Sequence, residues 1–110
     1  YIPTFIATNS TESLTNSSSA ASVSTAVSLV DSSGGATGLS LAAGVTGQIK
    51  TIICTTAGNN ITITPAATVG SGTTIVLDAA GESVTLMYTG SAWAAIATSS
   101  FASSISTVIQ

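Results

Sequence analysis

The stretch that decides the fold is residues 47–93, which read GQIKTIICTTAGNNITITPAATVGSGTTIVLDAAGESVTLMYTGSAW. Apolar runs in this stretch alternate with short clusters of Gly, Asn and Ser, a pattern typical of consecutive antiparallel strands joined by tight turns. In residues 60–64 isoleucines alternate with threonines, and a second alternation of period two runs over residues 83–88. The stretch therefore predicts β-structure throughout.

The same pattern covers most of the remaining chain. Residues 57–60, Ala-Gly-Asn-Asn, are predicted to form a hairpin between two strands, since Gly and Asn accept positive φ at little cost. We expect an all-β chain, a small antiparallel β-sandwich or barrel of about seven to eight short strands with an extended N-terminal arm. The predicted strands are residues 23–30, 39–41, 47–56, 60–64, 73–78, 82–89 and 92–98, with a further terminal strand at 105–109.

The length of 110 residues indicates one domain, which we divide into an N-terminal arm (1–21), a β-domain (22–98) and a C-terminal tail (99–110). Residues 8–21 are rich in Ser, Thr and Asn and are expected to run along a surface or to remain mobile. The apolar start of the chain either closes the domain's own core or docks on a neighbouring subunit. The candidate assembly interface comprises apolar residues of both ends: Tyr1, Ile2, Phe5, Ile6, Phe101, Ile105, Val108 and Ile109.

Charge is scarce in this chain. Four carboxylates and one base, Lys50, give a net charge of −3, and 5% of the residues are charged. Such a surface is either a solvated Ser/Thr face or, as we favour, a surface buried in permanent subunit contacts. Nucleic acid is not an expected partner, because its phosphates require clustered Lys and Arg. A membrane partner is not expected either, because no apolar run approaches the ~18 residues of a spanning helix.

The residues needed for catalysis are missing or scattered. The chain has no His, which excludes a Ser-His-Asp triad and a Cys-His pair. Asp78 and Glu82 flank a turn and are expected to cap it, not to act as a glycosidase pair. The carboxylates and Cys54 have no metal-ligand spacing, and Cys54 is expected to be a small buried hydrophobe. We therefore expect no enzyme activity, no metal and no cofactor.

Three further features each have two interpretations. Lys50 is either an exposed strand residue whose charge discourages edge pairing, which we favour, or the amine of an isopeptide crosslink to an Asn or Asp. Trp93 is expected to pack in the core and not to stack on a ligand. Asn9, Asn16 and Asn60 begin Asn-X-Ser/Thr sequons, which matter only in a host that glycosylates proteins.

The motifs of residues 47–93 also occur in a recognisable order. They are Gly-Gln-x-Lys at 47–50, Thr-Pro-Ala at 64–66, Gly-Thr-Thr-Ile at 72–75, Gly-Glu-Ser-Val-Thr-Leu at 81–86 and the closing Trp93. This succession resembles a β-rich structural module of marine tailed-phage virions, found in cyanophage-type fibre, knob and head-decoration proteins. The resemblance covers under half of the chain. It implies a virion location, a homo-oligomer that is often a trimer, and contact with other virion proteins such as the major capsid protein.

Two functional hypotheses follow, and a third is weaker. The first is a non-enzymatic structural protein of a phage particle, either a capsid decoration or a fibre or knob subunit. The alternative is an extracellular, pilus-like filament subunit at the cell surface, assembled by β-strand addition of its N-terminal segment. Deleting residues 1–10 is expected to stop a filament from polymerising and to spare a decoration or knob oligomer. The third hypothesis is a carbohydrate-binding module in which Trp93, Tyr88 and Tyr1 stack on sugars.

Overall fold

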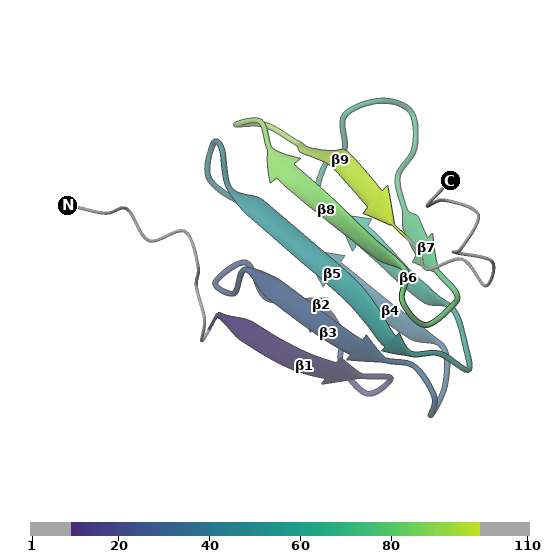
Figure 1. Cartoon of the computed structure of the whole chain (residues 1–110). Helices are drawn as coiled ribbons and strands as arrows, with labels where there is room; N and C mark the ends of the chain where they lie inside the picture. The colour runs from purple at the N-terminus through teal and green to yellow at the C-terminus, as the bar shows by residue number, and fades with distance from the viewer. Residues whose placement is uncertain (1–9, 100–110) are drawn as a thin grey trace, which may run out of the picture.

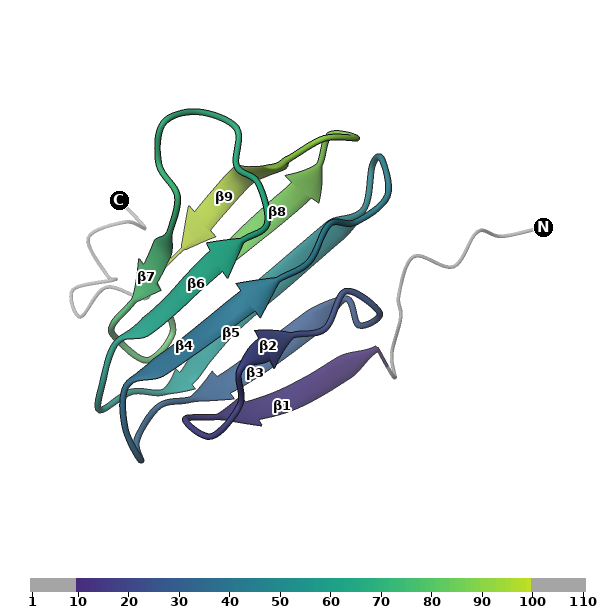
Figure 2. The ribbon, with the colours of Figure 1, turned by 180° about the vertical axis from the view of Figure 1, so that it is seen from behind.

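The structure, a computed structural model, describes residues 10–99 of the 110. These residues form nine strands and no helix, and the strands lie in two sheets packed face to face (Figures 1 and 2). The prediction of an all-β, sandwich-like domain is therefore confirmed. The strands are β1 (Thr11–Thr15), β2 (Ala20–Ala21), β3 (Val27–Asp31), β4 (Thr37–Leu41), β5 (Ile49–Thr56), β6 (Ile61–Pro65), β7 (Ile75–Leu77), β8 (Ser83–Tyr88) and β9 (Trp93–Ser99).

The first six strands alternate between the two sheets. Sheet A has the order β1-β3-β5-β8-β9 and sheet B the order β2-β4-β6-β7. In sheet A, Val27 of β3 lies between Thr11 of β1 and Thr51 of β5, and all three strands are parallel. Strands β2, β4 and β6 are likewise parallel in sheet B. Each pair of strands thus forms one layer of a short stack, as in β-solenoids.

The last three strands run antiparallel to their neighbours. Strand β7 pairs with β6, β8 pairs with β5, and β9 pairs with β8. The sheets are therefore mixed, and the prediction of a purely antiparallel sandwich is correct only for this part of the chain. The alternative of a barrel is wrong, because the described strands form two separate sheets.

The predicted hairpin at residues 57–60 is also wrong. This connection leads from β5 in sheet A to β6 in sheet B and so arches over the edge of the core. The side chain of Asn59 in this arch donates to the Ser32 carbonyl at 2.9 Å, and the Ser32 hydroxyl donates to the Asn59 carbonyl at 2.7 Å. A short Gly/Asn connection can reverse the chain in either way, and burial of the inner faces of both strands against one core selects the arch.

The core lies between the sheets and follows the period of two. Ile61 and Ile63 of β6 are fully buried, and β8 buries every second residue, which confirms both alternations. In β3 the buried face carries Ser28 and Val30, while Val27 and Leu29 on the other face are half-buried. The buried apolar core consists of Ala21, Val30, Leu39, Leu41, Ile52, Cys54, Ile61, Ile63, Leu77, Val84, Leu86, Tyr88 and Trp93.

Part of the predicted N-terminal arm, residues 1–21, lies in the two sheets. Residues 11–21 contribute β1 and β2, which extend sheets A and B by one strand each. Strand pairing uses the backbone and so needs few apolar side chains; here Leu14 packs against the core. The eight residues of the candidate interface, Tyr1, Ile2, Phe5, Ile6, Phe101, Ile105, Val108 and Ile109, lie outside the described residues, as does the predicted strand at 105–109.

Candidate functional site

A polar cluster around Lys50 lies between the two sheets. Lys50 is on the inner face of β5, the middle strand of sheet A, and its side chain is fully buried. The prediction of an exposed lysine is therefore wrong, because the side chain shares its face with Ile52 and Cys54. Its Nζ donates to the Thr25 hydroxyl at 2.8 Å and to the Thr25 carbonyl at 3.1 Å.

Glu12 of β1 supplies the opposite charge. Its Oε2 lies 3.6 Å from Lys50 Nζ and accepts hydrogen bonds from the Ser28 hydroxyl and from the Ser22 backbone N–H, the latter at 2.8 Å. Among the described residues, the carboxylate that pairs with Lys50 is therefore that of a glutamate, Glu12. An isopeptide bond of the predicted kind would need an Asn or Asp here, so the geometry is that of an ion pair.

The environment shifts the pKa of both groups. Burial disfavours the charge of Glu12, but the hydrogen bonds from Ser28 and Ser22 and the nearby Lys50 outweigh it, so the Glu12 pKa lies below 4.5. Burial lowers the pKa of Lys50 below 10.5, and the attraction of Glu12 offsets this only in part. The cluster ties β1 and the loop at residues 22–26 to β3 and β5, which is a structural role.

The remaining three carboxylates lie at one end of the sandwich. We call this the acidic end; it includes Asp31 at the end of β3 and the β7–β8 connection at residues 78–82 (Figure 1). Glu82 Oε1 accepts from the backbone N–H of Asp78 at 2.6 Å and of Ala79 at 3.1 Å, which confirms the predicted turn cap. Burial raises the pKa of the Cys54 thiol, and the three carboxylates raise it further, so this thiol is protonated and inert.

The opposite end carries no charged residue in its connections. We call it the neutral end; it comprises residues 22–26, 42–48, 66–74 and 89–92 (Figures 1 and 2). Trp93 organises this end: its indole N–H donates to the Ala42 carbonyl at 2.9 Å, and its ring meets Tyr88 edge to face at 5.1 Å. Above this core, Val45 is 71% and Val69 59% exposed.

The aromatic positions decide the third hypothesis. Trp93 is 1% and Tyr88 8% exposed, which confirms core packing of Trp93 and leaves neither ring free to stack on a sugar. Tyr1 lies outside the described residues, as does the sequon at Asn9. The other two sequon asparagines, Asn16 and Asn60, are exposed.

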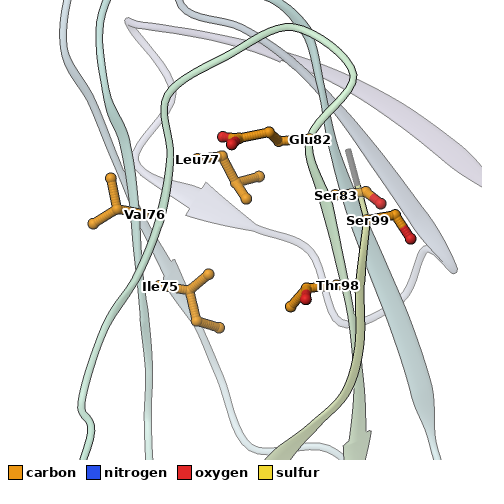
Figure 3. A pocket seen from close by; sticks show the side chains of 7 residues that line it. All are labelled: Ile75, Val76, Leu77, Glu82, Ser83, Thr98 and Ser99. Atoms are coloured by element: carbon orange, nitrogen blue, oxygen red, sulfur yellow. The ribbon is translucent and has the colours of Figure 1, made fainter. Parts of the chain in front are cut away.

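A groove that the sequence did not predict lies between β7 and β9. It contains a hollow of about 230 Å³ lined by β7, by Glu82 and Ser83, and by Thr98 and Ser99 of β9 (Figure 3). A second hollow of about 170 Å³ continues it toward Trp93, and Ile75 lines both. Ile75 and Leu77 carry the period of two, but no local signal in the sequence shows that, within residues 10–99, no strand pairs with the outer edge of β7.

Comparison of the chain with known protein families and with curated proteins gives no match. Within residues 10–99 there is no helix long and apolar enough to cross a membrane, and no group of three or more potential ligands that could hold a metal ion.

Proposed function

We propose that this chain is a non-enzymatic structural subunit that acts through contacts between subunits, as a decoration, fibre or knob protein of a phage particle. The observation that carries the proposal is the segregation of charge. Glu12 and Lys50 cancel each other inside the sandwich, so the net charge of −3 is that of Asp31, Asp78 and Glu82 at the acidic end.

The neutral end is suited to a protein contact. Its four connections expose Val45 and Val69 among uncharged residues, and apolar surface without charge is typical of the cores of subunit interfaces. The acidic end, in contrast, would place like charges together if two copies met through it. Copies therefore associate through the neutral end and keep the acidic end in water.

The phage setting rests on the resemblance of residues 47–93 to virion modules. That resemblance favours a trimer, which joins three copies of one surface around a three-fold axis. The partners are then further copies of this chain and virion proteins such as the major capsid protein.

The test is the native mass of the chain at micromolar concentration, by light scattering and native mass spectrometry. A discrete oligomer is expected, with a trimer favoured, and Val45→Glu combined with Val69→Glu is expected to dissociate it. Ala36→Glu, an exposed position at the acidic end, is the matched control and should leave the mass unchanged. A monomer at every concentration would overturn the proposal.

The second candidate, a filament subunit, has one observation in its favour. Strand β1 is the edge of sheet A and pairs with β3 on one side, so among the described residues its other edge is open to strand addition. The segment that would be donated, residues 1–9, precedes this strand directly.

Deletion of residues 1–9 separates the two candidates. The cut falls before Ser10, because the Ser10 carbonyl accepts from the backbone N–H of Ala26 at 3.0 Å and of Val27 at 3.1 Å, and a cut after Ser10 would disturb the fold. A filament should stop growing in negative-stain electron micrographs of the deletion variant. The discrete oligomer of the first candidate should keep its number of subunits.

A further inference from the structure

The two sheets differ in size. Sheet A has five strands and sheet B four; β9 is an edge strand of sheet A and β7 an edge strand of sheet B, and the two lie on the same side of the sandwich (Figures 1 and 2). Burial reflects this difference: every second residue of β8 is buried, whereas β9 buries Trp93 and exposes residues 95–99. In the described chain no strand of sheet B covers this part of β9.

The uncovered region is the groove between β7 and β9. Apolar side chains line both hollows: Leu77 lines the first, beside the polar side chains of Glu82, Ser83, Thr98 and Ser99 (Figure 3). Leu86 and Trp93 line the second, and Ile75 lines both. The wall of the groove is the outer edge of β7, which pairs with β6 on its other side. A backbone edge beside apolar side chains is the receptor geometry of β-strand addition, in which backbone hydrogen bonds give affinity and alternate side chains fill pockets.

We propose that residues 105–109 of the same chain, Ile-Ser-Thr-Val-Ile, occupy this groove as an antiparallel strand on β7 and complete sheet B to five strands. Strand β9 ends at Ser99, which itself lines the groove, so the occupant is tethered beside its site. Five residues, 100–104, connect them and reach about 16 Å when extended. Packed sheets lie ~10 Å apart, so this connection is long enough.

Direction and pattern agree with this occupant. Strands β5 and β9 run in the same direction, because both are antiparallel to β8. The arch after β5 turns the chain back, so β6 runs opposite to β5, and β7 is antiparallel to β6. Strand β7 therefore has the direction of β9. A chain that turns back after β9 therefore runs antiparallel to β7. Ile105, Thr107 and Ile109 share one face by the period of two, and the two isoleucines fill the two hollows.

The tether also favours the same chain as the occupant of the groove. A linker of five residues keeps the segment at a local concentration of about millimolar or higher, which favours the same chain over a second copy. This inference concerns one chain alone, so it stands or falls separately from the assembly role proposed above.

Disulfide trapping tests the proposal. Val76 of β7 is 49% exposed on the outer face of sheet B, where Ser106 and Val108 would lie beside it. Val76→Cys is combined with Ser106→Cys or with Val108→Cys, and the oxidised chains are measured by intact mass and non-reducing electrophoresis. We expect a monomeric crosslink in at least one pair, because a disulfide requires Cβ atoms about 4 Å apart. Cys54 is retained, since it is fully buried.

The matched control pairs Ser106→Cys with Ser13→Cys, because Ser13 is exposed on β1 at the opposite edge of sheet A. It should not crosslink within one chain. Crosslinked dimers as the only product of the Val76→Cys pairs would show that the segment binds a second copy, and this would overturn the proposal. Absence of any crosslink would overturn it as well.

Hydrogen exchange of the unmodified chain gives an independent measurement. Amides of β7 are expected to exchange about tenfold more slowly, or slower still, in the full chain than in a chain ending at Ser99, while β3 and β5 keep their protection in both. If the shortened chain unfolds, the comparison is made within the full chain, between β7 and the edge strand β1. Equal, fast exchange of β7 and β1 would contradict the proposal.

Discussion

Lys50 and Glu12 cancel each other's charge inside the sandwich, where a charge without a partner would be costly. Their side chains are 0% and 21% exposed, so the lysine depends on its partners more than the glutamate does. Thr25 gives Lys50 two neutral acceptors, but only Glu12 gives it a negative charge among its contacts in the described chain. Removal of the Glu12 charge and removal of the Lys50 charge should therefore have unequal effects on stability.

Glu12→Gln is expected to lower the free energy of unfolding by about 2 kcal/mol, because it leaves a buried ammonium without a counter-charge. The double variant Glu12→Gln/Lys50→Met should recover most of this loss, since a buried ion pair is often replaceable by apolar or neutral side chains. Urea denaturation followed by Trp93 fluorescence measures both. A double variant less stable than Glu12→Gln alone would contradict the argument.

The pKa of Glu12 predicts a specific dependence on pH. The folded pKa lies below the ordinary value of 4.5, so the stabilisation from this carboxylate is present in full above that value and is lost as the pH falls through the folded pKa. The difference in unfolding free energy between the natural chain and Glu12→Gln should be constant from about pH 7 to pH 5 and shrink in stronger acid. Urea titrations at several pH values measure it, and a difference that grows in acid would refute the assignment.

At the scale of elements, the arches distinguish this stack from a meander of hairpins. Ser32 follows β3 and Asn59 follows β5, and two reciprocal hydrogen bonds join them because β3 and β5 are parallel neighbours. Ser32 is fully buried, and its carbonyl accepts from the Asn59 side chain at 2.9 Å and from the Gly35 backbone N–H at 3.3 Å, so loss of Asn59 leaves it only the longer hydrogen bond.

Ser32→Ala and Asn59→Ala should each lower the free energy of unfolding, measured by urea denaturation, by about 1 kcal/mol. Their effects should be nearly additive, because each side chain donates to the backbone carbonyl of the other residue and not to its side chain. Asn60→Ala is the matched control: its side chain is exposed like that of Asn59 but takes no part in these two hydrogen bonds, so it should contribute little. Single variants no less stable than Asn60→Ala would mean that the arches do not bond to each other, and so would contradict the parallel arrangement.

The sequence predicts the strands better than their connections. Alternation in residues 60–64 and 83–88 identifies both the strands and their buried faces, because burial on one face imposes a period of two. The same period places Lys50 on the face of Ile52 and Cys54, which indicates burial. We predicted an exposed side chain because lysine is rarely buried. The arch at residues 57–60 and the pairing of Lys50 with Glu12 depend on contacts between distant segments, which no local pattern contains.

At the scale of the whole molecule, the charge distribution gives the sandwich two different ends. The three carboxylates of the acidic end account for the net charge, and the neutral end contributes none. In a chain with 5% charged residues these few groups are the main electrostatic barrier to non-specific association, because net charge near zero favours precipitation.

The triple variant Asp31→Asn/Asp78→Asn/Glu82→Gln changes the net charge from −3 to 0 and should lower the solubility at pH 7 several-fold, as measured by light scattering after concentration. Gln at position 82 keeps an oxygen that can accept from the backbone N–H of residue 78, so the β7–β8 turn should remain closed. Far-UV circular dichroism checks this. The control is Glu12→Gln/Lys50→Met, which removes one charge of each sign, keeps the net charge at −3 and should stay soluble. If both variants precipitated alike, packing inside the sandwich and not charge at its acidic end would limit solubility. If neither did, the exposed Ser and Thr residues would suffice to keep the molecule in solution, and orientation by charge repulsion would lose its basis.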